Sequence, residues 1–386
     1  MTTRLDDAKQ PRACTRCVMD ETVPGIRFDQ DGKCNYCRMQ DELEQRFPLG
    51  DEGARILQGM SEQIRRDGRG LAYDCVVGVS GGRDTSYCLY YVKEIMGLRP
   101  LAVHFDNGWD SDIAKTNLAR LCDALDVELH TIIMDWPDSR ELTNANIRAC
   151  VPYIDITDDV GIASALYRTA AKEGLRHIIM SHSFREEGIT PLAWNYMDAR
   201  FAREIIRRHA TAPIKTFQNV DIHHMLYWMF VKGIRLVNIT NYYDDTGDKI
   251  ERLLADKYGW VDTGQHHMDN ELFALVYHYS RHKFGFDWRV VELSAKVRTG
   301  VISREDALKA LQTPPFFETD EMVDYCLKKQ GISREEYESI LKAPNKYFTD
   351  YPTYYPLLRL FKWPIKLLCR RHILPAHVYE KYFDAV

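Results

Sequence analysis

The residues with the clearest capacity for chemistry belong to a short glycine-rich segment that reads Ser-Gly-Gly-Arg-Asp-Thr-Ser. Its two glycines allow backbone amides to approach a phosphate group without a clash from a Cβ atom. A helix starting within the segment would add the positive end of its dipole, and Asp84 would hold Mg²⁺ against the phosphates. The segment therefore predicts a phosphate-binding loop, formed by Ser80, Gly81, Gly82, Arg83, Asp84, Thr85 and Ser86.

This loop matches neither of two common nucleotide-binding motifs. It is not G-x-x-x-x-G-K-[ST] and not G-x-G-x-x-G, so a Walker-type ATPase and a dinucleotide site are both disfavoured. The competing explanation is a glycine-rich turn between a strand and a helix that binds nothing. The clustered hydroxyl groups favour the phosphate site.

Four cysteines near the start of the chain form a second group of reactive side chains. Their spacing, C-x2-C-x16-C-x2-C, is typical of a structural zinc ribbon, in which each pair turns both sulfurs toward one tetrahedral ion. A redox pair is the alternative, but such a pair opens a helix after a strand, and neither pair is expected to do so. The predicted ligands of Zn²⁺ are Cys14, Cys17, Cys34 and Cys37.

Short apolar runs predict the strands that position the loop. They cover residues 73–79, 101–105, 128–134, 177–181 and 235–240, and amphipathic helical stretches alternate with them. This alternation predicts an α/β fold with a parallel, doubly wound sheet covered by helices on both faces. Ligands of such sheets bind at the carboxyl ends of the strands, which is where the loop stands.

The chain divides into five predicted regions. We expect a cysteine module at 1–45, a helical connector at 46–70, the doubly wound domain at 71–245, a helical substrate-binding or lid region at 246–345, and a basic and aromatic tail at 346–386. The helical region is expected because the strand-like runs stop there and similar helix-start signals follow.

Composition and charge exclude several classes of protein. The 386 residues are 45% hydrophobic and 28% charged, which is ordinary for a globular protein and excludes a mostly disordered chain. The net charge is −5, so no global cationic field points to a nucleic acid partner. The polar start and the absence of a long apolar run lead us to expect a cytoplasmic protein.

The pattern S-G-G-x-D-[ST]-S after the first predicted strand resembles the PP-loop of the ATP pyrophosphatases, among them GMP synthetase, NAD synthetase, asparagine synthetase and tRNA thiolases. These enzymes split ATP between its α- and β-phosphates and adenylate a carbonyl-type oxygen, which a nucleophile then displaces. The resemblance implies ATP and Mg²⁺ as cofactors and the HUP-like fold of that superfamily. It also implies an adenosine site at Phe105 and Asp106, and further phosphate or metal contacts at His182.

Four ordered blocks are similar to the N-acetyl sugar amidotransferase family, which serves lipopolysaccharide and related surface-glycan biosynthesis. They read CTRCVMDETVPGIRFDQDGKCNYC, SGGRDTS, HSFREEGITPLAWNYMD and KFGFDWRVVELSAKVRTGVISREDAL, and the similarity spans residues 12–345. Ahead of KFG the family tends to have G-K-H followed by an acid. This chain instead has Gln265-His266-His267-Met268, so its phosphate contacts there and its substrate identity stay open.

The resemblance implies an ATP-dependent amidotransferase that acts on a nucleotide-activated N-acetyl sugar. An oxygen of the sugar attacks the α-phosphate of ATP, pyrophosphate leaves, and ammonia displaces AMP. The product is an acetamidine if the oxygen belongs to an acetamido group, and a uronamide if it belongs to a uronic carboxylate. Asp84, Arg185 and Glu187 are the candidate catalytic residues, the last two as contacts for the activated sugar or the metal.

The nitrogen source is expected to be a separate protein. None of the ten cysteines lies in the glycine-flanked turn of a triad glutaminase. The family is associated with separate glutaminase and ammonia-conducting subunits, and the resemblance implies such partners here.

Two other functions compete with this interpretation. A tRNA thiolase also combines a PP-loop with C-x-x-C pairs, but it would need a catalytic cysteine near the strands and a basic RNA-binding surface. A nucleotide-binding scaffold without catalysis is the third hypothesis.

The tail supports two hypotheses. It is either a terminal helix docked on the protein's own core or a peripheral contact with the inner face of the membrane, with Trp363 at headgroup level. If residues 354–374 are helical, basic residues share one face beside an apolar stripe. The basic residues are Arg359, Lys362, Lys366 and Arg370, and the apolar ones are Leu358, Phe361, Ile365 and Cys369.

Overall fold

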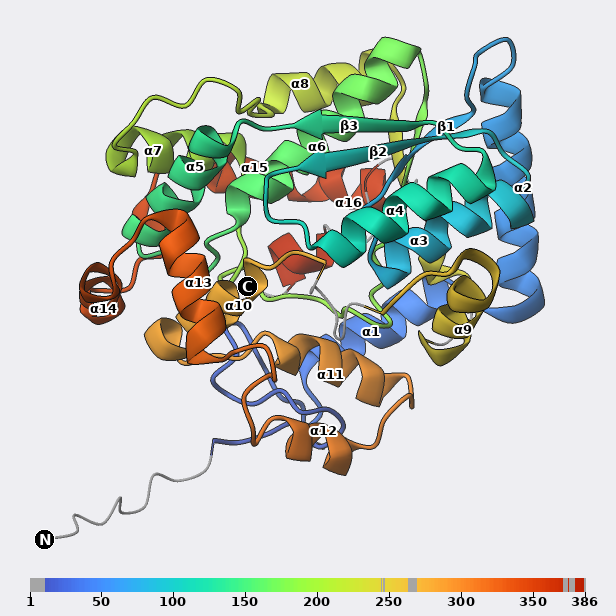
Figure 1. Ribbon diagram of the computed structural model, residues 1–386. Helices are drawn as coiled ribbons and strands as arrows, with labels where there is room; N and C mark the ends of the chain where they lie inside the picture. Colours follow the sequence, from blue (N-terminus) through green and yellow to red (C-terminus); the bar gives the residue numbers. More distant parts are fainter. Residues whose placement is uncertain are drawn as a thin grey trace, which may run out of the picture.

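A parallel sheet stands at the centre of the molecule (Figure 1). The structure is a computed structural model that describes residues 11–243, 245, 247–262, 269–370, 374 and 379–384. The strands follow the order β3-β2-β1-β4-β5, and every neighbouring pair is parallel. Their bounds lie close to those expected: β1 (Cys75–Gly78), β2 (Pro100–Asp106), β3 (Leu129–Ile133), β4 (His177–Met180) and β5 (Arg235–Asn238).

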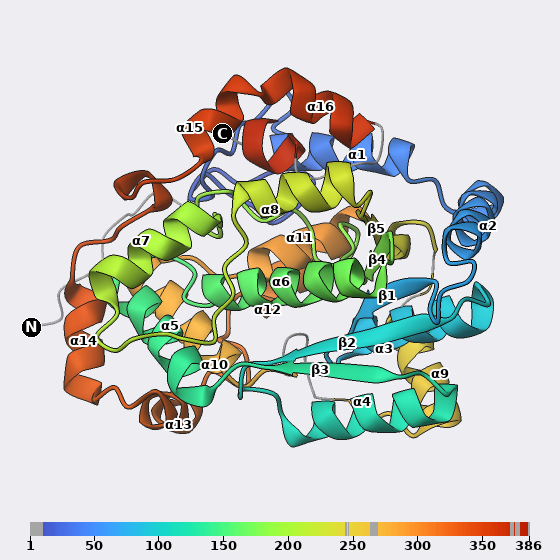
Figure 2. The same cartoon turned by 90° about the horizontal axis from the view of Figure 1, so that it is seen from above.

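Helices cover both faces of the sheet, which confirms the predicted doubly wound α/β fold (Figure 2). One apolar core joins one face of the sheet to α2 (Gly50–Asp67), α3 (Arg83–Tyr90) and α4 (Asp112–Leu125). A different core joins the opposite face to α6 (Ile156–Glu173). Val76 and Val77 of β1 contribute to these two different cores, which is why the central strand is apolar on both sides.

The strand order reverses at β1, which lies between β2 and β4. The chain continues from β1 to β2 and β3 on one side, and then crosses to β4 and β5 on the other. Open parallel sheets bind ligands at the carboxyl ends of the strands beside such a reversal. The predicted phosphate loop follows β1 at this crevice.

A further apolar core is built from helices that lie far apart in the sequence. Residues from the predicted helical region pack there with two helices that precede β5, so the helical region shares its core with the rest of the chain. The helices concerned are α5 (Trp136–Arg148), α7 (Ala199–His209), α10 (Phe273–Tyr279), α13 (Asp320–Gln330) and α14 (Arg334–Lys342).

The remaining helices surround these cores. They are α1 (Asn35–Arg46), α8 (Ile222–Leu226), α9 (Gly247–Tyr258), α11 (Arg289–Arg298), α12 (Arg304–Ala310), α15 (Tyr355–Leu360) and α16 (Lys362–Arg370). Short π-helical turns cover Tyr91–Ile95, Tyr227–Val231, Ser280–Phe284 and Glu380–Asp384, and 3-10 turns cover Ile239–Asn241 and Phe348–Asp350. Within the described residues, no helix has both the length and the apolar composition needed to cross a membrane.

Candidate active site

The glycine-rich loop is held in shape by its own hydroxyl groups. The backbone N–H of Ser80 donates to Thr85 Oγ1 at 3.1 Å, and that hydroxyl donates to the carbonyl of Gly82 at 3.2 Å. Gly82 is the residue before α3, and no side chain caps the first turn of this helix. The first amides of α3 are therefore available to an anion, which is the arrangement that binds phosphate.

Gly81 is the position in this loop with the strongest requirement for glycine. Its φ is +87°, and a Cβ atom placed there would lie 2.1 Å from the carbonyl oxygen of Ala114 in α4. The carbonyl of Gly81 in turn accepts a hydrogen bond from Trp260 Nε1 at 3.1 Å. The loop is thus pressed against α4 and anchored to the segment that follows α9.

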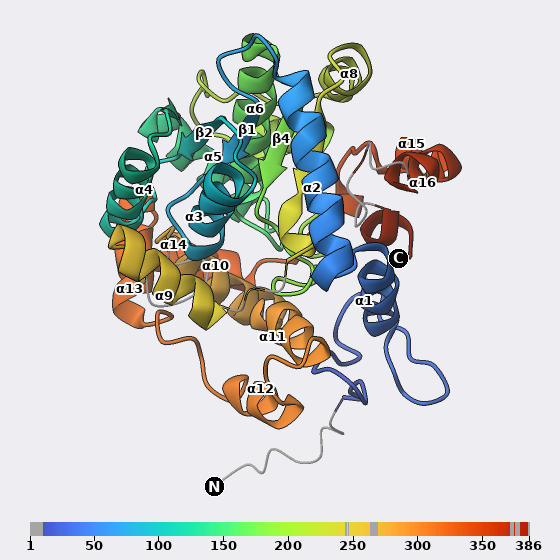
Figure 3. The same cartoon turned by 90° about the vertical axis from the view of Figure 1, so that its right-hand side faces the viewer.

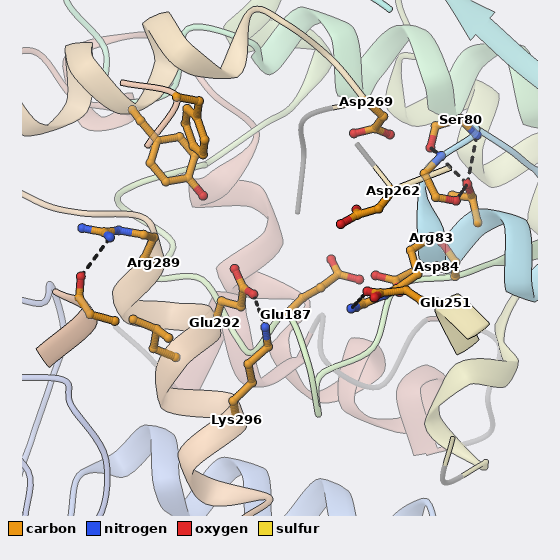
Figure 4. A pocket seen from close by; sticks show the side chains of 17 residues that line it. Ser80, Arg83, Asp84, Glu187, Glu251, Asp262, Asp269, Arg289, Glu292 and Lys296 are labelled. Atoms are coloured by element: carbon orange, nitrogen blue, oxygen red, sulfur yellow. Dashed lines mark hydrogen bonds and ion pairs between the residues drawn. The ribbon is translucent and has the colours of Figure 1, made fainter. Parts of the chain in front are cut away.

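A cavity of about 460 Å³ opens in front of the loop (Figure 4). The loop, the segment after β4 and α9 lie on one side, and α11 with its neighbouring segments forms the opposite wall. Figure 4 shows Arg83 and Asp84 on one side and Arg289, Glu292 and Lys296 on the opposite side. The polar lining consists of Ser80, Arg83, Asp84, Thr85, Ser181, Glu187, Glu251, Asp262, Asp269, Tyr277, Arg289, Glu292 and Lys296.

Arg83 joins three elements around the cavity. Its guanidinium pairs with Asp84 at 2.7 Å, with Glu186 after β4, and with Glu251 of α9 at 3.5 Å. Burial alone would lower the pKa of Arg83, but these three carboxylates outweigh burial and raise it. Arg83 is therefore a permanent cation that fixes α9 against the loop.

Carboxylates outnumber cations in the cavity. Six acidic side chains and three basic ones line it, and Lys296 is already paired with Glu292. Such a lining repels a bare polyphosphate and favours one that carries divalent cations. Carboxylate oxygens are also the ligands that Mg²⁺ prefers, so the residues present fit an Mg²⁺-bound phosphate.

A second cavity of about 270 Å³ adjoins the first and shares Ser80, Thr85 and Ser181 with it. It lies between α6 and the carboxyl ends of β1, β2 and β4. Its apolar wall is formed by Val103, Phe105, Ile162, Ala165, Leu166 and Met180. This apolar wall beside the loop suits the face of a nucleoside base, and the predicted adenosine residue Phe105 is part of it. The lining also has polar side chains, which include His104, Asn107, Asp110, Asp155, Asp158 and Asp159.

His104 forms a buried ion pair on the wall of this second cavity. Its Nδ1 lies 2.9 Å from the carbonyl oxygen of Val79, and its Nε2 lies 2.9 Å from Asp110 Oδ2. The carbonyl of Val79 can only accept, so Nδ1 donates to it, and Nε2 donates to the Asp110 carboxylate when His104 is protonated. Burial lowers the pKa of His104, but the hydrogen bond and charge of Asp110 outweigh burial and raise it.

Three of the predicted binding residues line neither these two cavities nor the two described next. Gly81 lies against the Ala114 carbonyl of α4, where it determines the shape of the loop. The Ser86 hydroxyl is buried without a hydrogen-bond partner. Asp106 Oδ1 accepts the backbone N–H of Gly108 at 2.8 Å and so closes a turn after β2.

His182 and Glu187 lie together in a third cavity, of about 240 Å³. His182 Nδ1 is 2.6 Å from Glu187 Oε2, and Glu187 Oε1 accepts the N–H of Ser183 at 3.1 Å. Glu187 also lines the first cavity, so it stands where the two meet. Tyr153, Asn195 and Trp288 lie among the other lining residues and provide a surface suited to a sugar ring and its hydroxyl groups.

Arg185 lies in a fourth cavity, of about 260 Å³, which shares Asp84 and Ser181 with the first. Its guanidinium donates to the carbonyl of Phe47 at 2.6 Å and pairs with Glu44 at 3.5 Å. In this structure the predicted catalytic arginine therefore also attaches α1 to the site. Its role in catalysis stays a prediction.

Sequence reasoning missed the wall that faces the loop. Glu251, Asp262 and Asp269 gave no signal, whereas Arg289, Glu292 and Lys296 are spaced by three and four residues. That spacing places the three on one face of α11 and could have been noticed. Residues 265–268, where the chain departs from the amidotransferase pattern, lie outside the described residues.

The four predicted metal ligands converge at the N-terminal end of the described chain. Their ligand atoms all lie within 4.8 Å of one another, and all four side chains are buried. The arrangement can hold one metal ion and fits a zinc-ribbon-like module. The second pair does open a helix, contrary to expectation, because Cys34 is the residue before α1 and Cys37 lies in its first turn.

Two arginines from the helical region attach to this module. Arg298, at the end of α11, donates to Cys37 Sγ at 3.3 Å and to Cys17 Sγ at 3.4 Å. Arg304 donates to the carbonyl oxygens of Cys14 and Cys17, each at 3.0 Å. The metal module is thereby connected to the helices that form the far wall of the cavity.

The comparisons with known proteins agree with this arrangement in part. Residues 239–364 match a family described as LPS biosynthesis protein WbpG-like, C-terminal domain. That region contains α9 to α15 and thus the wall that faces the phosphate loop. An uncharacterized protein of Methanocaldococcus jannaschii is 22% identical over 308 residues, which cover 78% of this chain and 93% of that protein.

Similar solved structures include the NH3-dependent NAD synthetase of Campylobacter jejuni, with 14% identity and a TM-score of 0.28 over 68% of this chain and 98% of that one. The U34-tRNA thiolase NcsA of Methanococcus maripaludis, with its [4Fe-4S] cluster, has 10% identity and a TM-score of 0.29 over 80% and 89%. Similarity at this level does not discriminate between functions.

Proposed function

We propose that the protein is an ATP-dependent amidotransferase that modifies a nucleotide-activated N-acetyl sugar for lipopolysaccharide or a related surface glycan. One observation carries this proposal. The 460 Å³ cavity joins the Ser80–Ser86 loop directly to α11, which lies in the region similar to the lipopolysaccharide biosynthesis domain. A phosphate-binding loop and a glycan-related domain thus face one another across a single space.

The adjoining cavities suggest where each substrate part binds. The adenosine of ATP would occupy the second cavity against the apolar wall with Phe105, and its phosphates would lie on the loop amides in front of α3. The sugar would occupy the cavity of His182, Glu187 and Trp288. Glu187 borders both sides, so it lies where the sugar would meet the phosphates.

The reaction would proceed in two displacements. A carbonyl-type oxygen of the sugar attacks the α-phosphorus of ATP, and the bond to pyrophosphate breaks. Ammonia then attacks the activated carbon, and AMP leaves with the original oxygen, giving an acetamidine or a uronamide. The loop amides and Arg83 would stabilise the charge on the departing pyrophosphate, which is electrostatic catalysis.

Asp84 is the residue proposed to hold Mg²⁺, with the neighbouring carboxylates of the cavity in support. Magnesium would neutralise phosphate oxygens as charge moves onto the leaving group. Asp84 lines both the first and the fourth cavity, so its carboxylate is exposed to bound ligands.

We further propose that the metal held by the four cysteines is zinc. Neighbouring sulfurs lie 3.6, 3.7 and 3.8 Å apart. A tetrahedral ion with metal–sulfur bonds of about 2.3 Å separates its sulfurs by about 3.8 Å. An iron–sulfur cluster inserts its own iron and sulfide atoms between the cysteines and would hold them further apart.

A tRNA thiolase remains the alternative function, and the described residues give it little support. None of the ten cysteines lines any of the four adjoining cavities. Cys88 on α3 is fully buried, and burial raises the pKa of its thiol to about 12, which suppresses the nucleophilic thiolate.

The test is an ATP–pyrophosphate exchange assay with nucleotide-linked acetamido sugars or with tRNA as the second substrate. We expect exchange with a sugar and none with tRNA. With ammonium present, mass spectrometry should show AMP and a sugar lighter by the difference between an oxygen atom and an NH group. Release of ADP and phosphate, or exchange driven by tRNA, would contradict the proposal.

A further inference from the structure

The C-terminal tail forms two helices on the outside of the molecule (Figure 3). The chain breaks between α15 and α16 at Phe361, so one continuous helix is not formed. The inner side of the tail is docked, since Cys369 is buried and its carbonyl accepts a hydrogen bond from Arg46 of α1 at 3.2 Å. The sequence left two expectations for the tail. The first of them, a helix docked on the protein's own core, describes this inner side.

The outer side of the tail is apolar. Leu360 is 80% exposed, Trp363 77% and Leu367 49%. Trp363 and Leu367 are four residues apart and share one face of α16, and Leu360 is the last residue of α15, just before the break. Large apolar side chains grouped in this way on a surface mark a contact site.

The charge of the tail is opposite to that of the whole chain. The protein carries a net charge of −5, yet no acidic residue lies between Asp350 and Glu380. The basic residues of this stretch are Arg359, Lys362, Lys366, Arg370 and Arg371. The ammonium of Lys366 lies 4.8 Å from the centre of the Tyr379 ring.

We propose that this face of α15 and α16 binds the surface of an anionic lipid bilayer. Exposed leucine and tryptophan side chains bordered by lysine and arginine form the pattern of an interfacial helix, in which Trp363 would lie at headgroup level. The absence of acidic residues gives charge complementarity to anionic lipids. This contact goes beyond the reaction proposed above and does not depend on it.

Vesicle co-sedimentation of the full chain tests the contact. We expect binding to vesicles of phosphatidylcholine and phosphatidylglycerol, weaker binding to phosphatidylcholine alone, and loss of binding as NaCl is raised. The double variant Leu360→Ser/Trp363→Ser should bind at least about tenfold more weakly. Because both side chains are exposed, these changes should leave the fold intact, whereas deleting the tail would uncover the core that Tyr355 and Tyr382 cover.

Charge variants separate the electrostatic contribution to vesicle binding from the apolar contribution. Arg359→Gln and Arg370→Gln should each weaken binding about fivefold on anionic vesicles only. Matched controls are Ile133→Ser and Phe316→Ser, which are exposed apolar positions elsewhere, and Arg69→Gln, an exposed arginine on another surface. These controls should bind like the unmodified chain.

Three results would overturn the proposal. The first is no co-sedimentation of the full chain with anionic vesicles. The second is equal binding by the tail variants and their controls. The third is a dimer in light scattering that Leu360→Ser/Trp363→Ser converts to a monomer without vesicle binding, because the face would then be a protein interface.

Discussion

Replacing Arg298 with methionine tests how the cysteine module is held to the rest of the protein. The guanidinium is buried and donates to Cys17 Sγ and Cys37 Sγ at 3.4 and 3.3 Å. Four thiolates around one divalent ion carry a net charge of about −2, and Arg298 supplies positive charge at contact distance. Methionine keeps a similar length and removes both the charge and the donors.

The expected cost follows from these contacts. Hydrogen bonds to charged groups contribute about 1.5–3 kcal/mol each, and breaking a buried charge pair costs about 3–5 kcal/mol. We therefore expect Arg298→Met to lower the free energy of unfolding of the metal-loaded protein by about 3–5 kcal/mol. Loss of a residue that supports metal ligands lowers metal affinity by about 10–100-fold.

Arg304→Met is the matched control. Arg304 is also an arginine of the helical region bound to the cysteine module, but it donates to the carbonyl oxygens of Cys14 and Cys17 and not to sulfur. It should cost about 1–3 kcal/mol of unfolding free energy and leave the metal affinity unchanged.

Urea unfolding measures the stability of each variant, and competition with a chromogenic chelator measures its metal affinity. If Arg298→Met fails to fold, Arg298→Lys keeps the charge without the forked donors and should give an intermediate loss of affinity. Equal metal affinity in the unmodified protein and in both Arg298 variants would refute the reasoning.

Four other predictions concern the site and its reaction. Asp84→Asn should lower AMP formation at least about a hundredfold with an unchanged melting temperature, and a smaller loss would exclude Asp84 as the magnesium ligand. Gly81→Ala should lower the free energy of unfolding in urea by about 3 kcal/mol or more, because the new Cβ atom combines a positive φ with an overlap on the Ala114 carbonyl. Gly233→Ala, at φ +69° with nothing within 4 Å, should lower it by only about 1–2 kcal/mol. Equal losses in the two variants would show that the overlap has no effect. The pKa of His104 is raised in the folded protein, so the stabilisation that protonated His104 gives the fold is complete below pH 6.5 and is lost as the pH rises through the folded pKa. Urea unfolding across this pH range should therefore show a smaller pH dependence for Asp110→Asn than for the unmodified protein. An unchanged pH dependence would exclude the pair of His104 and Asp110 as its source. The isolated chain should form product with ammonium but not with glutamine, and an added glutaminase partner should restore the use of glutamine. Transfer of the labelled amide nitrogen of glutamine to the product by the pure chain would contradict this.

The near wall of the site could be predicted because local pattern determines it. The apolar run of β1, the two glycines and the hydroxyls follow one another within a few residues, so the strand, the loop and the helix start are encoded together. Gly81 shows this well, since its positive φ and its contact with α4 both require a residue without a side chain. The clustering of the four cysteines could be predicted in the same way, because their spacing is that of ligands to one metal ion.

The shared face of α11 could have been noticed, but its position opposite the loop could not be predicted, because that depends on how helices dock across the sheet edge. Glu251, Glu292 and Lys296 look like the solvated face of any amphipathic helix in the sequence. Only the packing of α9 and α11 in front of the loop turns those faces into a cavity lining. The contact of Arg298 with Cys17 spans 281 residues and has no local signal.

Helix α11 connects the cavity to the cysteine module, two features that come from separate parts of the sequence. Lys296 lines the cavity, and Arg298 contacts the cysteine sulfurs. Two residues differ by about 200° around a helix, so the two side chains leave α11 on opposite sides. One side of this helix therefore forms the site, and the other is fixed by the metal module. Because the helix is rigid between them, we expect a metal bound by the four cysteines to hold the far wall of the cavity at its distance from the predicted phosphate loop.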